Sequence, residues 1–174
     1  MSSTIASSRH HAAPACLLLA LALALASPVG LAAPPATPDL TTATIAELAA
    51  AMAKRQTTSE QLVRAYLERI EAFDDRGPMI NAVIVLDPTA LATARALDRE
   101  RRTKGPRGPL HGIPVVLKDN IETADLPTTV GSQLLEGHVA RADAAVVRRL
   151  REAGAVIVAK VNLSEFAGSG GSVS

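Results

Sequence analysis

Aromatic residues and cysteine are almost absent from this sequence. Of its 174 residues, none is Trp, one is Tyr, two are Phe and one is Cys. Proteins that bind bases or sugars by stacking rely on aromatic side chains, so a site of that kind is not expected. Neither sign of charge dominates, because 18 basic residues stand against 17 acidic ones, for a formal net charge of +1. This balance does not indicate a nucleic-acid partner or an anionic surface.

The N-terminal segment has the pattern of an export signal. Weakly basic residues 9–11 precede an apolar run at residues 15–26, which is shorter than a membrane span requires. Residues 24–26 form the small-x-small pattern read by signal peptidase, and a later cut near Ala32 is an alternative. An uncleaved anchor is the other interpretation. The short run and its Pro/Ala-rich flank favour cleavage, so we predict a signal peptide at residues 1–26 and a secreted or periplasmic product.

Cleavage would remove both Arg9 and Cys16. The 18 basic residues then become 17, which equals the 17 acidic residues. Without cysteine the exported product has no disulfide, so it needs a larger core to be stable. Residues 27–40 are rich in Pro and Ala and are predicted to form an extended linker. We expect no stable membrane insertion after cleavage.

Two helices are predicted directly after the linker. Thr44 and Glu47 have the spacing of a capping box and open the first helix. The second begins near residues 57–59, where Thr57 and Glu60 have capping-box spacing and Ser59 is a rival cap. Residues 74–78 end it. Apolar residues at helical spacing form its buried stripe, which is Leu62, Val63, Tyr66, Leu67 and Ile70.

The rest of the chain alternates strands and helices. Short apolar strands are predicted at residues 81–86, 113–117 and 155–160, and a helix at 142–153 separates the last two. A strand, a crossover helix and a strand indicate parallel pairing and an α/β fold. Another helix ends in the charged run 99–104, which we interpret as a solvated last turn and not as a phosphate or RNA patch.

The most informative run is residues 108–121, where two glycines and two prolines punctuate a loop ahead of a predicted buried strand. Lys118 follows this strand directly. An ammonium group in that position is poorly hydrated and its pKa tends to fall, and some hydrolases use a neutral lysine to activate serine. A lysine there is also commonly a surface residue with a buried stem, so the residues alone leave both interpretations open. We reject His111 as a base because no partner for it is visible in the sequence.

Several stretches in fixed order resemble the amidase signature family. Residues 112–120 look like its lysine-bearing segment, and the resemblance runs from about Thr44 to the last residue. Each motif alone would be weak, but their combination between Gly108 and Phe166 is specific. The further stretches are residues 128–132, 143–150, 154–160 and 162–166.

The resemblance implies a mixed sheet covered by helices and hydrolysis of small-molecule or peptide amides without a metal or an organic cofactor. It also implies a triad of one lysine and two serines, in which Lys118 matches the lysine. The neutral amine would take a proton from one serine, which relays it from the nucleophilic serine. The nucleophile attacks the amide carbon, an amine or ammonia leaves, and water cleaves the acyl-enzyme.

This sequence departs from the family pattern in one respect. Both family serines belong to a later motif, so Ser169, Ser172 and Ser174 are not assigned as nucleophiles. Asp119 and Asn120 either brace Lys118 or have structural turn roles. We therefore expect residues 41–174 to be the N-terminal part of an amidase domain, inactive alone and prone to aggregate because its strands lack neighbours.

Two alternatives remain at this stage. One is a non-catalytic exported α/β binding or partner module, which the absent serines favour. The other is the glutamine-hydrolysing subunit of a tRNA-dependent amidotransferase, against which the export signal argues. The sequence leaves the identity of the amide substrate and the oligomeric state open.

Overall fold

The computed structural model describes residues 39–168. The signal peptide predicted at residues 1–26, most of the 27–40 linker and Ser169, Ser172 and Ser174 lie outside this range. No helix within it combines the length and the hydropathy needed to cross a bilayer. The α-helices and strands are α1 (Ile45–Ala53), α2 (Ser59–Ile70), β1 (Val83–Leu86), α3 (Ala90–Lys104), β2 (Pro114–Lys118), α4 (Ala145–Glu152) and β3 (Val156–Val161).

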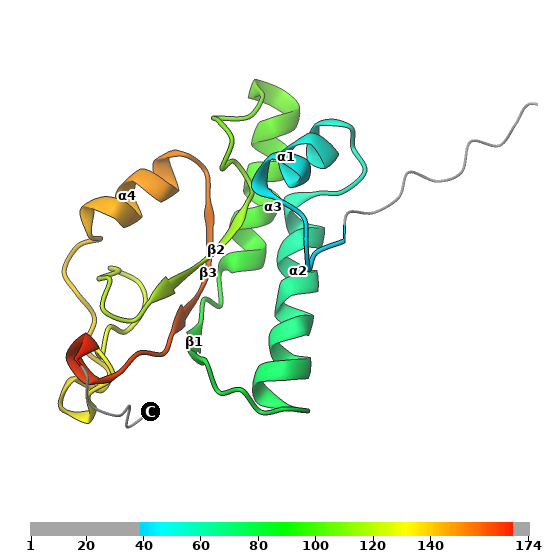
Figure 1. Cartoon of the computed structure of the whole chain (residues 1–174). Coiled ribbons are helices and arrows are strands. Elements are labelled where there is room, and N and C mark those ends of the chain that lie inside the picture. The colour runs from blue at the N-terminus through cyan, green and yellow to red at the C-terminus, as the bar shows by residue number, and fades with distance from the viewer. Residues whose placement is uncertain (1–38, 169–174) are drawn as a thin grey trace, which may run out of the picture. The chain divides into compact units, whose positions relative to one another are not determined.

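The three strands form one mixed sheet with β3 in the centre (Figure 1). The pairing of β2 with β3 is parallel, as predicted from the crossover helix α4 between them. The pairing of β1 with β3 is antiparallel. The predicted α/β class with a mixed sheet is therefore confirmed.

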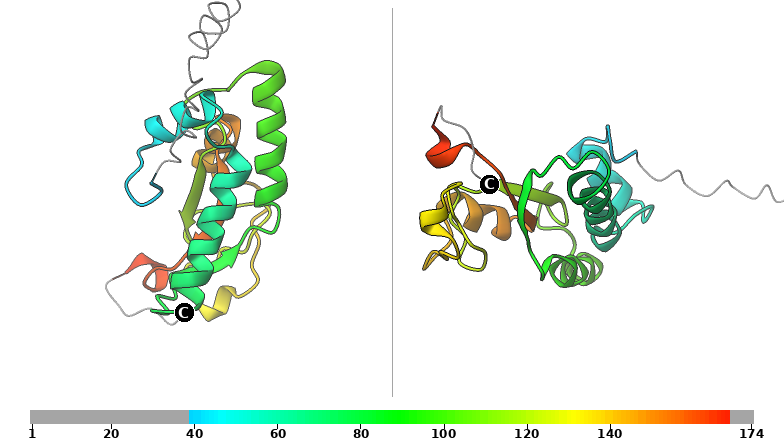
Figure 2. Two further views of the ribbon diagram at one scale, coloured as in Figure 1. Left: turned by 90° about the vertical axis from the view of Figure 1, so that its right-hand side faces the viewer. Right: turned by 90° about the horizontal axis from the view of Figure 1, so that it is seen from below.

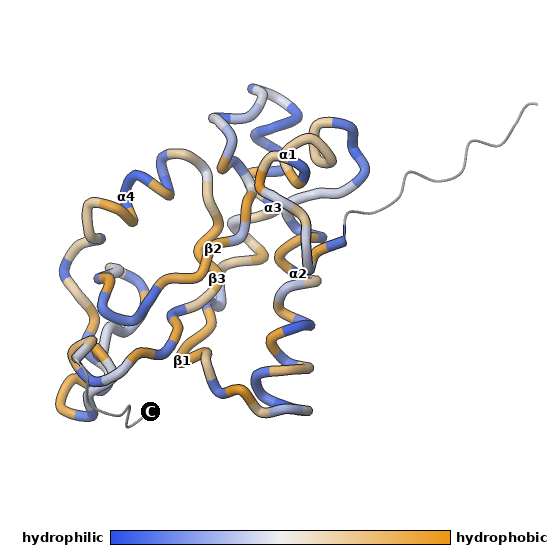
Figure 3. The backbone as a smooth tube through the Cα atoms, in the orientation of Figure 1, coloured by the Kyte–Doolittle hydropathy of each residue, from blue (hydrophilic) through white to orange (hydrophobic). Residues whose placement is uncertain are grey.

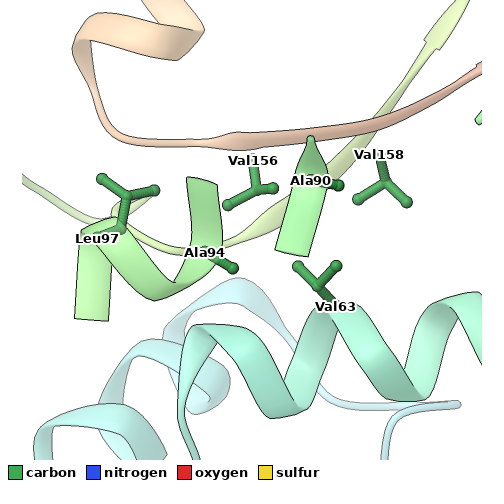
Figure 4. Close-up of a cluster of buried hydrophobic side chains, with 6 residues drawn as sticks. All are labelled: Val63, Ala90, Ala94, Leu97, Val156 and Val158. Carbon is green, nitrogen blue, oxygen red and sulfur yellow. The ribbon is translucent and has the colours of Figure 1, made fainter. Parts of the chain in front are cut away.

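Helices cover both faces of the central strand, with α2 and α3 on one side and α4 on the other (Figures 1 and 2). Alternate residues of β3 supply the two cores, since successive side chains of a strand point to opposite faces. One core joins α2 and α3 to β3 (Figure 4) and consists of Val63, Ala90, Ala94, Leu97, Val156 and Val158. The other lies under α4 and consists of Leu117, Leu126, Val147 and Ile157.

The edge strand β2 is only partly buried, which corrects the prediction of a buried strand. Leu117 is 3% exposed, whereas Val116 is 50% exposed. All three strands consist largely of apolar residues (Figure 3). Within residues 39–168, however, no layer of helices or strands covers the face of β2 that carries Val116. An apolar groove of about 680 Å³ lies there, and its walls include Ile70, Phe73 and Val115.

The caps of the first two helices follow local side-chain chemistry. Thr44 and Glu47 form the predicted capping box of α1. At α2 the cap is Thr58, which forms a capping box with Gln61. The prediction that Thr57 or Ser59 caps this helix is therefore wrong. The Ser59 hydroxyl is already committed, because it donates to the Gly112 carbonyl over 2.8 Å. After Ile70 the helix continues as a π-helical turn, Glu71–Asp75, which ends in the predicted 74–78 region.

Two elements begin later than predicted, and an aspartate is involved each time. The strand β1 starts at Val83 and not at residue 81. The buried Asp74 carboxylate accepts the N–H groups of Ala82 and Val83, so these two groups are not available to a neighbouring strand. The helix α4 starts at Ala145 and not at 142. The Asp143 carboxylate instead accepts the Ala124 N–H over 2.9 Å, which keeps it in the loop.

Candidate functional site

The carboxyl ends of the parallel strands β2 and β3 lie at the same edge of the sheet. Lys118 is the last residue of β2, and its register partner is Val161, the last residue of β3. Two irregular segments start at this edge, residues 119–132 and residues 162–168. The second of them contains one short helical turn, Glu165–Ala167. In α/β sheets ligands bind at such an edge, so this is the candidate site.

The side chain of Lys118 is exposed and makes no hydrogen bond or ion pair with any residue in the 39–168 range. The expectation of a poorly hydrated amine is therefore not met within these residues. The reason lies in the strand alternation, which puts Lys118 on the same uncovered face as Val116. The amine is presented to whatever covers that face.

The next residue, Asp119, points the opposite way and is fully buried. One carboxylate oxygen, Oδ2, accepts the Thr129 N–H over 2.8 Å and the Thr129 hydroxyl over 2.6 Å. The Asp119 backbone is held as well, since its N–H donates to the Val161 carbonyl and its own carbonyl accepts the Val130 N–H. Asp119 thus ties the end of β2 to the neighbouring strand and to the following loop. Asn120 is exposed.

Lys160, the penultimate residue of β3, belongs to this site but was not foreseen from the sequence. Its side chain is 0% exposed, and Nζ lies 2.9 Å from Oδ1 of Asp119. The same amine donates to the Thr128 hydroxyl over 2.8 Å and to the Pro127 carbonyl over 3.1 Å. Oδ1 receives no well-aligned hydrogen bond, so its contact with the amine is chiefly ionic. One feature of the sequence could have pointed to Lys160, since it ends an apolar run just as Lys118 does.

A β-bulge brings Lys160 to this position. Val115 pairs with Ile157, but Val116 pairs with Ala159, so Val158 is an extra residue in β3. Strict alternation would put Lys160 on the face of Val158, under α2 and α3. The extra residue shifts the alternation of side chains between the two faces by one residue. Lys160 therefore becomes the partner of Leu117 on the α4 side.

Both loops at this edge contain strained backbone. Val130 has a φ of +50° and Phe166 a φ of +49°, in a region that β-branched and bulky residues rarely adopt. The two loops hold each other, because the Phe166 N–H donates to the Val130 carbonyl over 2.8 Å. A side chain at Gly131 would lie 3.0 Å from the Leu163 carbonyl oxygen. Strained residues held by their surroundings cluster at functional sites.

His111 lies elsewhere, and its partners were not foreseen. The ring is 1% exposed, with Nδ1 accepting the Arg107 N–H over 3.2 Å and Nε2 lying 3.0 Å from the Leu97 carbonyl. Both nitrogens are therefore engaged by the backbone, which leaves the ring in a structural role. Within residues 39–168 no three His, Cys, Asp or Glu side chains gather as a metal-binding group.

Comparisons with known proteins agree on one family. The sequence profile of the amidase family matches residues 61–174. A glutamyl-tRNA(Gln) amidotransferase subunit of Acidothermus cellulolyticus is 44% identical over 130 residues, which are 74% of this chain and 25% of that protein. A probable amidase of Arabidopsis thaliana is 46% identical over 159 residues, which are 87% of this chain and 30% of that protein.

Solved structures give the same answer. The peptide amidase of Stenotrophomonas maltophilia superposes with a TM-score of 0.68 at 52% identity, over 70% of this chain and 25% of that one. An amidase family protein of Bacillus anthracis superposes with a TM-score of 0.68 at 39% identity, over 71% and 25%. The chain spans about a quarter of the length of these two structures. With fold, motifs and profile in agreement, the chain belongs to the amidase family.

Proposed function

We propose that these residues form the N-terminal part of a longer, exported polypeptide that hydrolyses carboxamides, with Lys118 as its proton acceptor. The observation that carries the proposal is the position of Lys118, at the carboxyl end of β2 beside two interlocked, strained loops. The likeness to a peptide amidase at 52% identity supports amides as the substrate class.

The chemistry follows from the triad that the family resemblance implies. An ammonium group cannot accept a proton, so the Lys118 amine acts in its neutral form. It takes a proton from one serine, which takes one from the nucleophilic serine as that oxygen attacks the amide carbon. An amine or ammonia leaves with a proton, and water then cleaves the acyl-enzyme. Both serines would come from a part of the longer polypeptide that follows Ser174.

The uncovered face of β2 supports a longer polypeptide. Val116 is 50% exposed and Ile80 63%, and the apolar groove of about 680 Å³ lies beside them. Exposed apolar side chains gathered around a groove are typical of a face that contacts another part of a protein. We propose that the remainder of the polypeptide covers it and removes water from around Lys118.

The test is hydrolysis of simple amides by the longer polypeptide. Lys118→Ala is expected to lower kcat by at least about 10²-fold, because a positioned general base contributes this much. Lys104→Ala, at the exposed end of α3, is the matched control and should keep wild-type turnover. Wild-type turnover in Lys118→Ala would remove the proposal. N-terminal sequencing of the exported protein, with Ser27 expected first, tests the export signal.

A second candidate is glutamine hydrolysis within an amidotransferase complex, favoured by the 44% identity to one component of such an enzyme. The same Lys118 chemistry would serve it. The two candidates differ in substrate and compartment. Preferential turnover of glutamine by a protein that stays in the cytoplasm would support the second, whereas turnover of peptide C-terminal amides by an exported protein supports the first.

A further inference from the structure

Two buried charges at the candidate site have no role in the proposed chemistry. Asp119 and Lys160 are each 0% exposed, and their Oδ1 and Nζ atoms lie 2.9 Å apart. Moving two charges out of water is costly, and their mutual attraction offsets the cost only in part. A pair of this kind indicates a requirement beyond packing, because apolar residues would fill the same space at lower cost.

The pair adjoins the backbone that carries Lys118. The Lys118 carbonyl accepts the Ile121 N–H over 3.0 Å, and the Asp119 N–H donates to the Val161 carbonyl over 2.9 Å. Both groups belong to the peptide unit that joins Lys118 to Asp119. The Asp119 side chain is fixed in turn by Lys160 and Thr129. The direction in which the Lys118 side chain leaves the sheet therefore depends on this arrangement.

We propose that Lys160, through its ion pair with Asp119, is a positioning residue for the Lys118 amine. The proposal rests on the assigned role of Lys118 in amide hydrolysis. Without Lys160 the buried Asp119 carboxylate has no counter-charge, so it turns toward water and carries the end of β2 with it. The amine then lies away from the serine whose proton it must accept. Displacements on the order of 1 Å at a reacting group cost about 10²-fold in rate.

The experiment compares four forms of the longer polypeptide, which are wild type, Lys160→Met, Asp119→Asn and the double variant. Lys160→Met keeps the apolar stem and removes the charge, and Asp119→Asn keeps the shape of the carboxylate. Each single variant leaves one buried charge unpaired, whereas the double variant leaves none. Asp98→Asn is the matched control, because Asp98 is also a buried hydrogen-bonded carboxylate but lies on α3.

Each single variant is expected to lower kcat by about 10- to 100-fold and to change KM less than about threefold. The double variant should recover part of that loss, since coupled residues give non-additive effects. Asp98→Asn should lose stability and keep wild-type kcat. Three outcomes would each overturn the proposal. The first is wild-type kcat in folded Lys160→Met, and the second is a kcat loss in the double variant equal to the product of the two single losses. The third is a kcat loss in Asp98→Asn as large as that in the single variants.

A second measurement does not depend on activity. The rate at which an acylating reagent modifies the Lys118 amine is followed by mass spectrometry of the peptide that contains it. The rate should change by at least about threefold in Lys160→Met and Asp119→Asn and stay at the wild-type value in Asp98→Asn. An inactive wild type would remove the amidase proposal, while unchanged labelling in Lys160→Met would separately overturn the positioning role.

Discussion

Gly154 lies directly against His111, so that a methyl group on its Cα would be 3.0 Å from Nδ1 of the imidazole ring. Gly154 also has a φ of +82° and is the second residue after the end of α4, following the cap residue Ala153. Its N–H donates to the Arg151 carbonyl, and its own carbonyl accepts the Gly112 N–H over 2.7 Å. This glycine therefore joins the end of α4 to the loop that leads into β2.

Gly154→Ala should lower the free energy of unfolding by about 2–5 kcal/mol, the sum of a positive-φ penalty and overpacking against the ring. Gly137→Ala is the matched control, because Gly137 has a φ of +73° and open space around its Cα. It should cost only about 1–2 kcal/mol. Thermal unfolding of both variants measures the difference. Equal losses would mean that the contact with His111 is not close in solution.

Asp98 is a long-range cap for α2. Its two carboxylate oxygens accept the N–H groups of Ser59 and Glu60 over 2.9 and 3.0 Å, and the side chain is 8% exposed. Asp98→Asn should cost about 1.5–3 kcal/mol, because one N–H then faces an amide NH₂ and the charge at the helix N-terminus is lost. Thr58→Ala, which removes the local cap, should cost about 1 kcal/mol. Thermal unfolding measures both losses, and a smaller loss of stability in Asp98→Asn than in Thr58→Ala would contradict this prediction.

Glu100 and Arg107 link the end of α3 to the loop that precedes β2. Hydrogen bonding from Arg107 holds the pKa of Glu100 below its ordinary value of 4.5. A carboxyl group whose pKa is lowered by folding stabilises the protein above its unfolded pKa and loses this effect as the pH falls through the folded value. The stability difference between wild type and Glu100→Gln should therefore be present at neutral pH, decline as the pH falls below 4.5, and disappear once the pH is below the lowered pKa of folded Glu100. A difference that persists in acid would refute this account of the pair.

Local patterns were sufficient for much of the fold. The Thr44–Glu47 capping box, the stop at Gly154 and the parallel pairing of β2 with β3 were predicted correctly, because each depends on residues close in sequence or on a general rule of chain connection. The error at the cap of α2 has a long-range cause. Thr58 became the cap of α2 while the neighbouring Ser59 hydroxyl bonds to Gly112, which is 53 residues away.

The sequence by itself determined the family, the alternation of helices and strands, and Lys118 as the residue to test, because motif order and short-range periodicity are written along the chain. Only the tertiary structure decided that Asp119 pairs with Lys160. That contact needs the parallel register of two strands and the extra residue Val158, which turns Lys160 to the α4 side. A bulge shifts every later side chain by one face, and whether it forms depends on packing on both sides of the sheet.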